Sequence, residues 1–181
     1  MNTTTKTIIA IAFAASLTVA AEATIKGKSM LAAADKNKTA LIVKTLRAGV
    51  DTNDIRSTNE YCETVLIIAA RNGNLQLVQS LLATKVYTKK DIITGDCDGN
   101  TAMMYAVNNK DVKMMQLLAS FHSEDDLHTN NANKESAVSY AKKLGGDIET
   151  VMSSIIDTAH KATLVQISTV QSDMPVLVRG K

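Results

Sequence analysis

Tryptophan is absent from this chain of 181 residues, proline occurs once, and the aromatic side chains are four Tyr and two Phe. An antiparallel β-sandwich is built from β-branched and aromatic residues, so this composition argues against that class. So few rings also leave too little surface on which nucleic acid bases could stack. The many Ala, Leu and Met residues favour helices instead. We therefore expect an all-α fold.

A strong excess of charge is missing as well. The chain has 20 Lys and Arg against 18 Asp and Glu, which gives a net charge of +2. That balance provides no cationic field for nucleic acid or for an anionic membrane surface. No apolar run reaches the roughly 20 residues that a transmembrane helix needs. We expect no nucleic acid partner and no integral membrane segment in the mature chain.

The longest apolar run, residues 8–19, lies near the N-terminus. Lys6 precedes it, and a short segment with Ala21 and Ala23 on either side of a glutamate follows it. A basic start, an apolar core and an Ala-x-Ala end are typical of a secretory signal peptide. We expect residues 1–23 to be cleaved near Ala23, with export to the periplasm of a Gram-negative bacterium or out of the cell. An uncleaved amphipathic or buried helix is the alternative.

The rest of the chain is repetitive. Three stretches align without gaps, at residues 31–49, 67–85 and 104–122. Their equivalent alanines, Ala33, Ala69 and Ala106, lie 36 and 37 residues apart, and a looser fourth copy covers residues 139–155. Units of this length cannot bury an apolar face alone, so neighbouring copies stack into a solenoid.

Each copy has the pattern of two helices joined by a tight turn. Gly73 marks that turn in the second copy, because glycine enters the left-handed backbone region at little steric cost. Asn37 and Lys110 hold the equivalent positions, where we expect the lysine to cost about 1 kcal/mol. Leucines and methionines then follow at helical spacing, and burying each large apolar side chain contributes roughly 1.5–3 kcal/mol.

The second and third copies carry the most specific motifs. The second has Thr64-Val65-Leu66-Ile67-Ile68-Ala69-Ala70, then Gly73-Asn74, Leu77-Val78 and Leu81-Leu82. The third has Asp98-Gly99-Asn100-Thr101, then Ala106, Met114-Met115 and Leu117-Leu118. These stretches resemble the ankyrin repeat, whose pattern is Gly-x-Thr-Pro-Leu-His-x-Ala-Ala followed by Gly-His, Val-Val and Leu-Leu. The period exceeds the family's repeat of about 33 residues, which implies longer connecting fingers.

The resemblance implies an all-α, ankyrin-repeat solenoid of about four helix-turn-helix repeats. We place the repeat domain at residues 24–157, with repeats near 28–60, 61–97, 98–132 and 133–157. Residues 158–181 form a C-terminal helix or tail. The pattern leaves open whether a helix over residues 157–169 or strands over residues 164–170 and 176–178 follow the repeats.

In such a solenoid the fingers and the first helices line a concave groove that binds partners. The motif places these residues there: Tyr61 and Asp98 on fingers, and Ile68, Arg71, Asn72, Tyr105, Asn108, Asn109, Tyr140 and Lys143 on first helices. Tyr and Arg are residue types that anchor interfaces. We expect a monomer that binds another protein. The alternative for Tyr105 and Tyr140 is that they only cover amphipathic helix faces.

Export would also change side-chain chemistry. Cys62 and Cys97 lie on consecutive fingers, and an oxidising compartment would allow a disulfide that closes a loop of about 35 residues. Two separate thiols are the alternative, because the cysteines are not at equivalent finger positions. Residues 37–39, Asn-Lys-Thr, form an N-glycosylation sequon in a eukaryotic host.

Catalytic motifs are missing. No Ser or Cys stands in a nucleophile motif, so we expect no enzymatic activity, no cofactor and no metal. His122, Glu124, Asp125, Asp126 and His128 lie close together and could serve a divalent ion. Acidic residues before a helix or in a solvated loop explain the same cluster without metal.

Together these features predict an exported ankyrin-repeat interaction module, an adaptor or scaffold that binds a protein through its concave face. Two alternatives stay open. One is an inhibitor or immunity-type protein that blocks an envelope enzyme or toxin. The other is an accessory protein that delivers metal or haem.

Overall fold

The computed structural model of the chain describes residues 27–49 and 51–172, with side chains up to residue 162. The predicted signal peptide at residues 1–23, its cleavage site near Ala23 and the end of the chain after Ser172 lie outside the described residues. The helices are α2 (Gly27–Asp35), α3 (Thr39–Ala48), α4 (Thr52–Ile55), α5 (Val65–Arg71), α6 (Leu75–Ala83), α7 (Lys89–Ile93), α8 (Ala102–Asn108), α9 (Val112–Ala119), α10 (Glu124–His128), α11 (Ala137–Leu144) and α12 (Gly146–Ser172).

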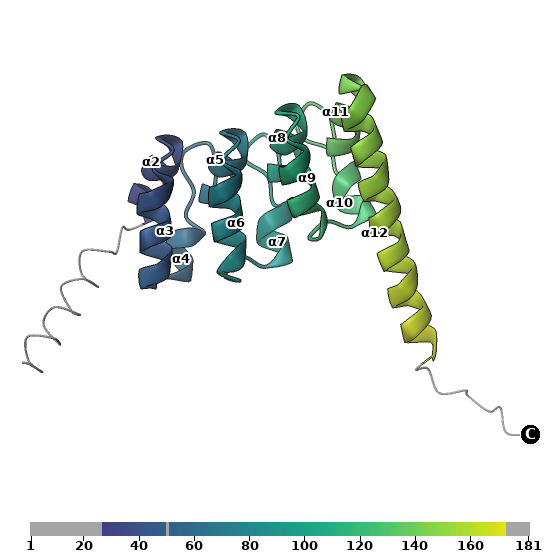
Figure 1. Cartoon of the computed structure of the whole chain (residues 1–181), viewed down its shortest axis with the longest axis horizontal. Coiled ribbons are helices and arrows are strands. Elements are labelled where there is room, and N and C mark those ends of the chain that lie inside the picture. Colours follow the sequence, from purple (N-terminus) through teal and green to yellow (C-terminus); the bar gives the residue numbers. More distant parts are fainter. Residues whose placement is uncertain (1–26, 50, 173–181) are drawn as a thin grey trace, which may run out of the picture.

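Four antiparallel helix pairs stand side by side in chain order: α2 with α3, α5 with α6, α8 with α9, and α11 with α12 (Figure 1). First helices pack against first helices, as α5 does against α2 and α8, and second helices pack against second helices. Outside an isolated antiparallel bridge between Thr58 and Thr64, the described residues form no β-structure. The all-α solenoid predicted from the repeats is confirmed.

Side-chain caps explain where the first helices begin. The hydroxyl oxygens of Thr64, Thr101 and Ser136 each accept a hydrogen bond from a backbone N–H in the first turn of α5, α8 and α11. Such a cap satisfies one of the N–H groups that a helix start leaves unpaired. The turn after each first helix has a residue with positive φ, 52° at Asn37 and 56° at Lys110, as the repeat pattern predicts.

The core runs through the whole described stack. Small side chains where first helices meet, including Ala34, Ala70 and Ala106, are fully buried. Larger side chains from the second helices, such as Ile42, Leu77 and Met114, fill the space between the two layers. Because each pair covers the apolar face of the next, the core is continuous from α2 to α12.

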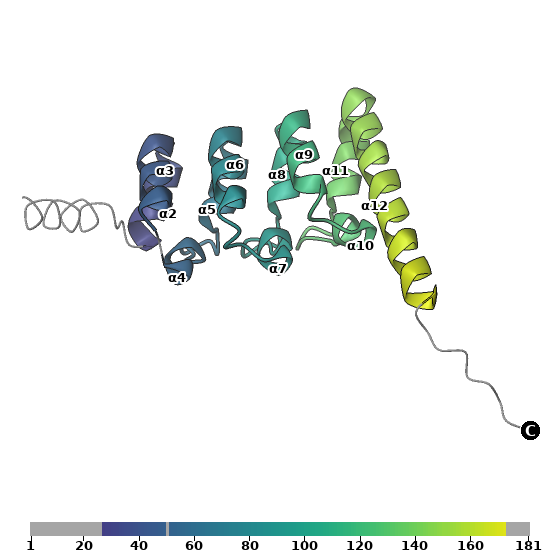
Figure 2. The ribbon, with the colours of Figure 1, turned by 60° about the horizontal axis from the view of Figure 1, so that its bottom comes forward.

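The links between the pairs contain short helices that the sequence pattern did not predict. In Figure 2, α4, α7 and α10 lie in a row along one edge of the stack. Capping boxes begin α7 at Thr88 and α10 at Ser123, where the side chain of the third residue returns a bond to the cap. Ile92 and Leu127 anchor these two helices in the core.

The C-terminal region resolves the choice that the sequence left open. Helix α12 runs as far as Ser172, so the helix is correct and strands over residues 164–170 are wrong. Residues 176–178 lie outside the described part. Figure 1 shows that α12 extends well beyond the ends of the other helices.

Candidate functional site

Three loops that precede first helices share one turn, and we call them finger 1 (residues 58–64), finger 2 (95–101) and finger 3 (130–136). In finger 1 the Asn59 Oδ1 accepts from the backbone N–H groups of Tyr61 and Glu63, at 3.0 and 2.9 Å. Asp96 and Asn131 make the equivalent bonds in fingers 2 and 3. One short polar side chain thus closes each finger, as an Asx turn does.

The fingers are also joined to one another. The Cys97 N–H donates to the Tyr61 carbonyl at 3.0 Å, and the Ala132 N–H donates to the Asp98 carbonyl at 2.8 Å. A disulfide links Cys62 to Cys97, with Cα atoms 5.0 Å apart. Fingers 1 and 2 therefore form a cross-linked unit, although the two cysteines hold different positions within their fingers.

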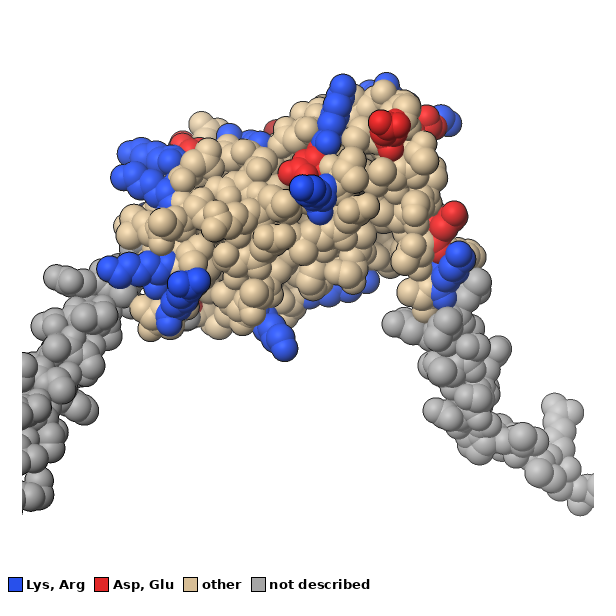
Figure 3. Space-filling model, in the orientation of Figure 1, with Lys and Arg blue, Asp and Glu red and all other residues tan. Residues whose placement is uncertain are grey.

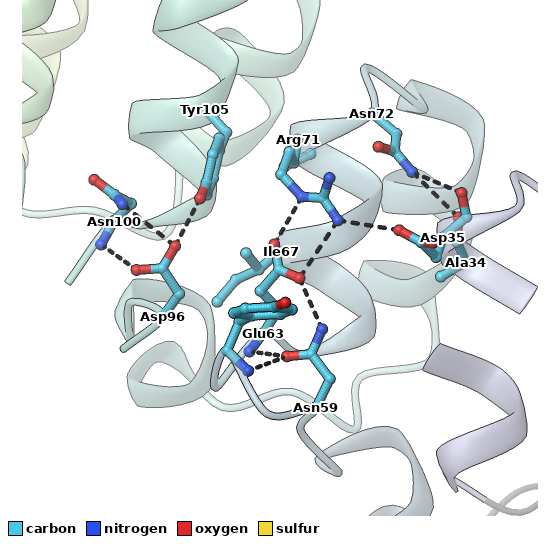
Figure 4. A network of polar contacts seen from close by, with 12 residues as sticks. Ala34, Asp35, Asn59, Glu63, Ile67, Arg71, Asn72, Asp96, Asn100 and Tyr105 are labelled. Carbon is cyan, nitrogen blue, oxygen red and sulfur yellow. Dashed lines mark hydrogen bonds and ion pairs between the residues drawn. The ribbon is translucent and has the colours of Figure 1, made fainter. Parts of the chain in front are cut away.

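A buried carboxylate lies beneath finger 1. Glu63 is 5% exposed, and its Oε1 lies 2.7 Å from the Arg71 Nε (Figure 4). Asn59 Nδ2 donates to the other carboxylate oxygen at 2.8 Å, and Arg71 also reaches Asp35 on α2 at 3.2 Å. Burial alone would lower the pKa of Arg71, but the Glu63 and Asp35 carboxylates outweigh it and raise that pKa. This network ties finger 1 to α2 and α5.

The third and fourth repeats have other polar contacts at the place of the Arg71–Glu63 ion pair. In the third repeat the Tyr105 hydroxyl donates to Asp96 Oδ2 at 2.6 Å, and burial together with Asp96 raises the pKa of Tyr105 (Figure 4). In the fourth repeat Lys143 pairs with Glu135, eight residues earlier, as Arg71 does with Glu63. Tyr105, Arg71 and Lys143, which the motif placed on the partner-binding face, thus each contact an acidic side chain of the same protein.

Asn72 and Asn109 join neighbouring first helices. The Asn109 Nδ2 donates to the carbonyl oxygens of Ala70 and Arg71, at 3.1 and 3.0 Å. The Asn72 Nδ2 donates to the equivalent carbonyls at the end of α2, at 3.3 and 3.5 Å. These amides satisfy carbonyls that a helix end leaves free, and they hold the repeats in register.

A groove opens between α2 and finger 1, with a volume of about 890 Å³. Lys28, Ala32 and Asp35 form its α2 side, and Glu60 and Tyr61 form its finger side. Tyr61 is 63% exposed, which makes it the most exposed large hydrophobic side chain of the described residues. The groove combines an exposed aromatic ring with charges of both signs.

The remaining predicted site residues differ in exposure. Ile68 is only 1% exposed, and it lies among the residues that line the bottom of the groove. Asp98 and Asn108 are exposed. Tyr140 is half-buried, and its hydroxyl accepts from Asn131 Nδ2 at 3.4 Å. Of the whole predicted set, only Tyr61 and Arg71 are brought together with Ile68 at the groove.

The acidic cluster around α10 has structural partners. Asp126 accepts from the Ser123 backbone and hydroxyl in the capping box, and it pairs with Lys89 at 3.1 Å. His122 is buried, with its Nδ1 2.9 Å from the Leu118 carbonyl, whereas His128 is exposed. Within residues 27–49 and 51–172, no His, Cys, Asp and Glu side chains gather in a group of three that could hold a metal ion.

On the face shown in Figure 3, Lys and Arg side chains gather toward the end of the stack formed by α2 and α3, and fewer charged side chains lie over the middle. Helix α6 carries no charged residue at all. None of the helices in the described chain combines the length and the apolar character needed to cross a membrane.

Comparison with known proteins supplies a family. A family model described as ankyrin repeats, in three copies, matches residues 29–133, which is more than half of the chain. A search of curated proteins finds no match.

Proposed function

The chain belongs to the ankyrin-repeat family, whose members are generally protein–protein interaction modules, and we propose that it acts as an exported binding module without catalysis. It holds another protein against the groove between α2 and finger 1. The observation that carries this proposal is the exposed Tyr61 ring at the rim of that groove.

Tyr61 has the features of an interface anchor. Tyrosine offers a large amphipathic surface and has few rotatable bonds, so binding orders it at a low entropic cost. The backbone on either side of it is already held, because its N–H bonds to Asn59 and its carbonyl accepts from Cys97. The neighbouring disulfide adds a covalent restraint. A preorganised finger of this kind loses little freedom on binding.

The disulfide also supports export. Paired thiols persist in oxidising compartments and are rare in the cytosol. Cys62 and Cys97 are the only cysteines in the chain, and they are bonded to each other. Together with the signal peptide pattern of residues 1–23, this pairing favours the periplasm or the cell exterior as the place of action.

The proposal is tested by comparing two truncations of exposed apolar side chains. Tyr61→Ala removes the anchor, while Leu41→Ala is a matched control on α3, where Leu41 is 43% exposed. We expect Tyr61→Ala to weaken partner binding by about thirtyfold, or about 2 kcal/mol, and Leu41→Ala to have little effect. Unchanged binding by both variants, with helicity retained, would exclude this groove as the binding site.

A further inference from the structure

The sequon at residues 37–39 lies close to the predicted mature N-terminus of the chain. Asn37 is followed by Lys38 and Thr39, and Asp35 stands two positions before it, which gives Asp-x-Asn-x-Thr. Asn-x-Ser/Thr is the acceptor sequence for N-linked oligosaccharides in surface loops of secreted proteins. Among the 12 asparagines of the chain, only Asn2 and Asn37 begin a sequon, and Asn2 lies within the predicted signal peptide.

The structure places Asn37 where a large substituent fits. It is exposed in the turn between α2 and α3, with φ 52°. Because α3 leads directly to α4, this turn lies at the opposite end of the helices from the row formed by α4, α7 and α10 (Figures 1 and 2). An oligosaccharide attached to Asn37 would therefore point away from the edge of the stack that the short helices occupy.

The side-chain amide of Asn37 is also used differently from those of its neighbours. Asn37 Oδ1 accepts a bond from Asn74 Nδ2 at 3.3 Å, and no hydrogen bond within the described residues involves Asn37 Nδ2. By contrast, the Nδ2 groups of Asn72 and Asn109 donate to helix carbonyls. A glycan on Asn37 replaces one hydrogen of Nδ2, so the bond that Oδ1 accepts persists in the modified protein.

We propose that Asn37 of the exported protein carries an N-linked oligosaccharide. In the transfer, Asn37 Nδ2 forms a bond to C1 of an oligosaccharide carried on a lipid diphosphate. The bond between C1 and the diphosphate oxygen breaks, the lipid diphosphate leaves with the electron pair, and a base of the transferase takes one proton from Nδ2. The donor and the membrane-bound transferase are supplied by the host.

Transfer takes place before the first repeat has folded. In the folded chain Asp35 pairs with Arg71, and the Thr39 hydroxyl accepts from Asn74 Nδ2 at 2.6 Å, so these two sequon residues are engaged. As the chain emerges from the membrane, the sequon precedes both of those partners and is free to enter a transferase. This order of events rests on the export that we propose above.

The test is mass analysis of the protein isolated from its own host. Digestion with a protease that cuts before Asp yields a peptide that begins at Asp35 and contains Asn37. We expect this peptide to be heavier by the mass of an oligosaccharide in a chain that starts near Thr24. Thr39→Ser keeps both the sequon and the hydroxyl that Asn74 uses, so it retains the glycan; Thr39→Ala and Asn37→Gln lose it.

The outcomes separate the two proposals. An unmodified peptide in a chain that starts near Thr24 overturns the glycan and leaves export standing. An unmodified peptide in a chain that starts at Met1 overturns export and the glycan with it.

Discussion

The Arg71 Nε lies 2.7 Å from Glu63 Oε1, and this pair holds finger 1 against α5. Glu63 is buried, while the Arg71 side chain is 37% exposed. Arg71→Ala leaves the carboxylate with only Asn59 as a side-chain donor. We expect this change to lower the free energy of unfolding by about 2 kcal/mol in a urea titration.

Lys143→Ala is the matched control for Arg71→Ala. Lys143 pairs with Glu135 at the equivalent place in the fourth repeat, but its side chain is 65% exposed. Exposed ion pairs contribute only about 0–1 kcal/mol, so this variant should unfold close to the parent. Equal losses from both substitutions would show that burial of Glu63 does not decide the strength of its pair.

Asn109 and Asn108 are adjacent on α8 and the turn after it, yet only Asn109 bonds to the neighbouring repeat. Asn109→Ala leaves two helix carbonyls without a side-chain donor, and we expect a loss of about 1–3 kcal/mol. Asn108→Ala removes an exposed side chain and should change stability by less than about 0.5 kcal/mol. The comparison fails if the two variants have the same melting temperature.

The disulfide between Cys62 and Cys97 closes a loop with a sequence separation of 35. In the chain-entropy model, opening such a loop costs about 4 kcal/mol of stability. We expect this loss in a Cys62→Ser, Cys97→Ser double variant, measured by chemical denaturation. Alkylation without a reductant provides the check: labelling of both thiols in the native protein would refute the bond.

His122 makes the stack sensitive to acid. Burial lowers the pKa of His122 below 6.5, and the positive charge of Lys89 lowers it further. The hydrogen bond with the Leu118 carbonyl and the charge of Asp126 raise this pKa, but by less. As the pH falls, His122 of the unfolded chain therefore binds a proton near pH 6.5, whereas His122 of the folded chain binds one only at a lower pH. Stability falls as the pH drops below about 6.5, by at most about 1.4 kcal/mol per pH unit, and levels off below the folded pKa.

His122→Gln provides the test for this acid sensitivity, because glutamine does not titrate. We expect unfolding titrations between pH 8 and pH 5 to show a smaller fall in stability for this variant than for the parent. An identical fall in both proteins would assign the acid sensitivity to other groups.

The repeats were predictable because the residues that define each helix pair and its turn lie close together in the sequence. Ala33, Ala69 and Ala106 are at most 5% exposed, as small residues at helix contacts must be. The turn positions predicted from Gly73 and Lys110 both have positive φ. Each of these properties depends on residues within one copy, so a single sequence is enough to reveal it.

The short helices were not predictable from periodicity. Helices α7 and α10 have five residues each, too few to show an apolar stripe. The available signal was the capping pair at each start, Thr88 with Asp91 and Ser123 with Asp126. In the second of these, the acidic residue belongs to the cluster that the sequence offered as a metal candidate.

The candidate site was predictable only in part, because side-chain partners from different elements cannot be deduced from spacing. The motif placed Tyr105, Asn72 and Asn109 on the binding face. In the structure the Tyr105 hydroxyl donates a hydrogen bond to Asp96, and the two Asn side chains donate to carbonyl oxygens of the preceding first helices. The finger residue Asn59 was missed, although polar residues recur at its position as Asp96 and Asn131. Tyr61, which the motif placed on a finger, is 63% exposed.

Photo-crosslinking in the native host tests most directly whether this is an exported module that binds through finger 1. A photoreactive phenylalanine analogue replaces Tyr61 in one variant and Gln79, an exposed residue of α6, in the other. The account predicts a protein adduct from position 61 and none from position 79, on a chain that starts near Thr24. An adduct only from position 79, equal adducts from both positions, or a bait that starts at Met1 would contradict it.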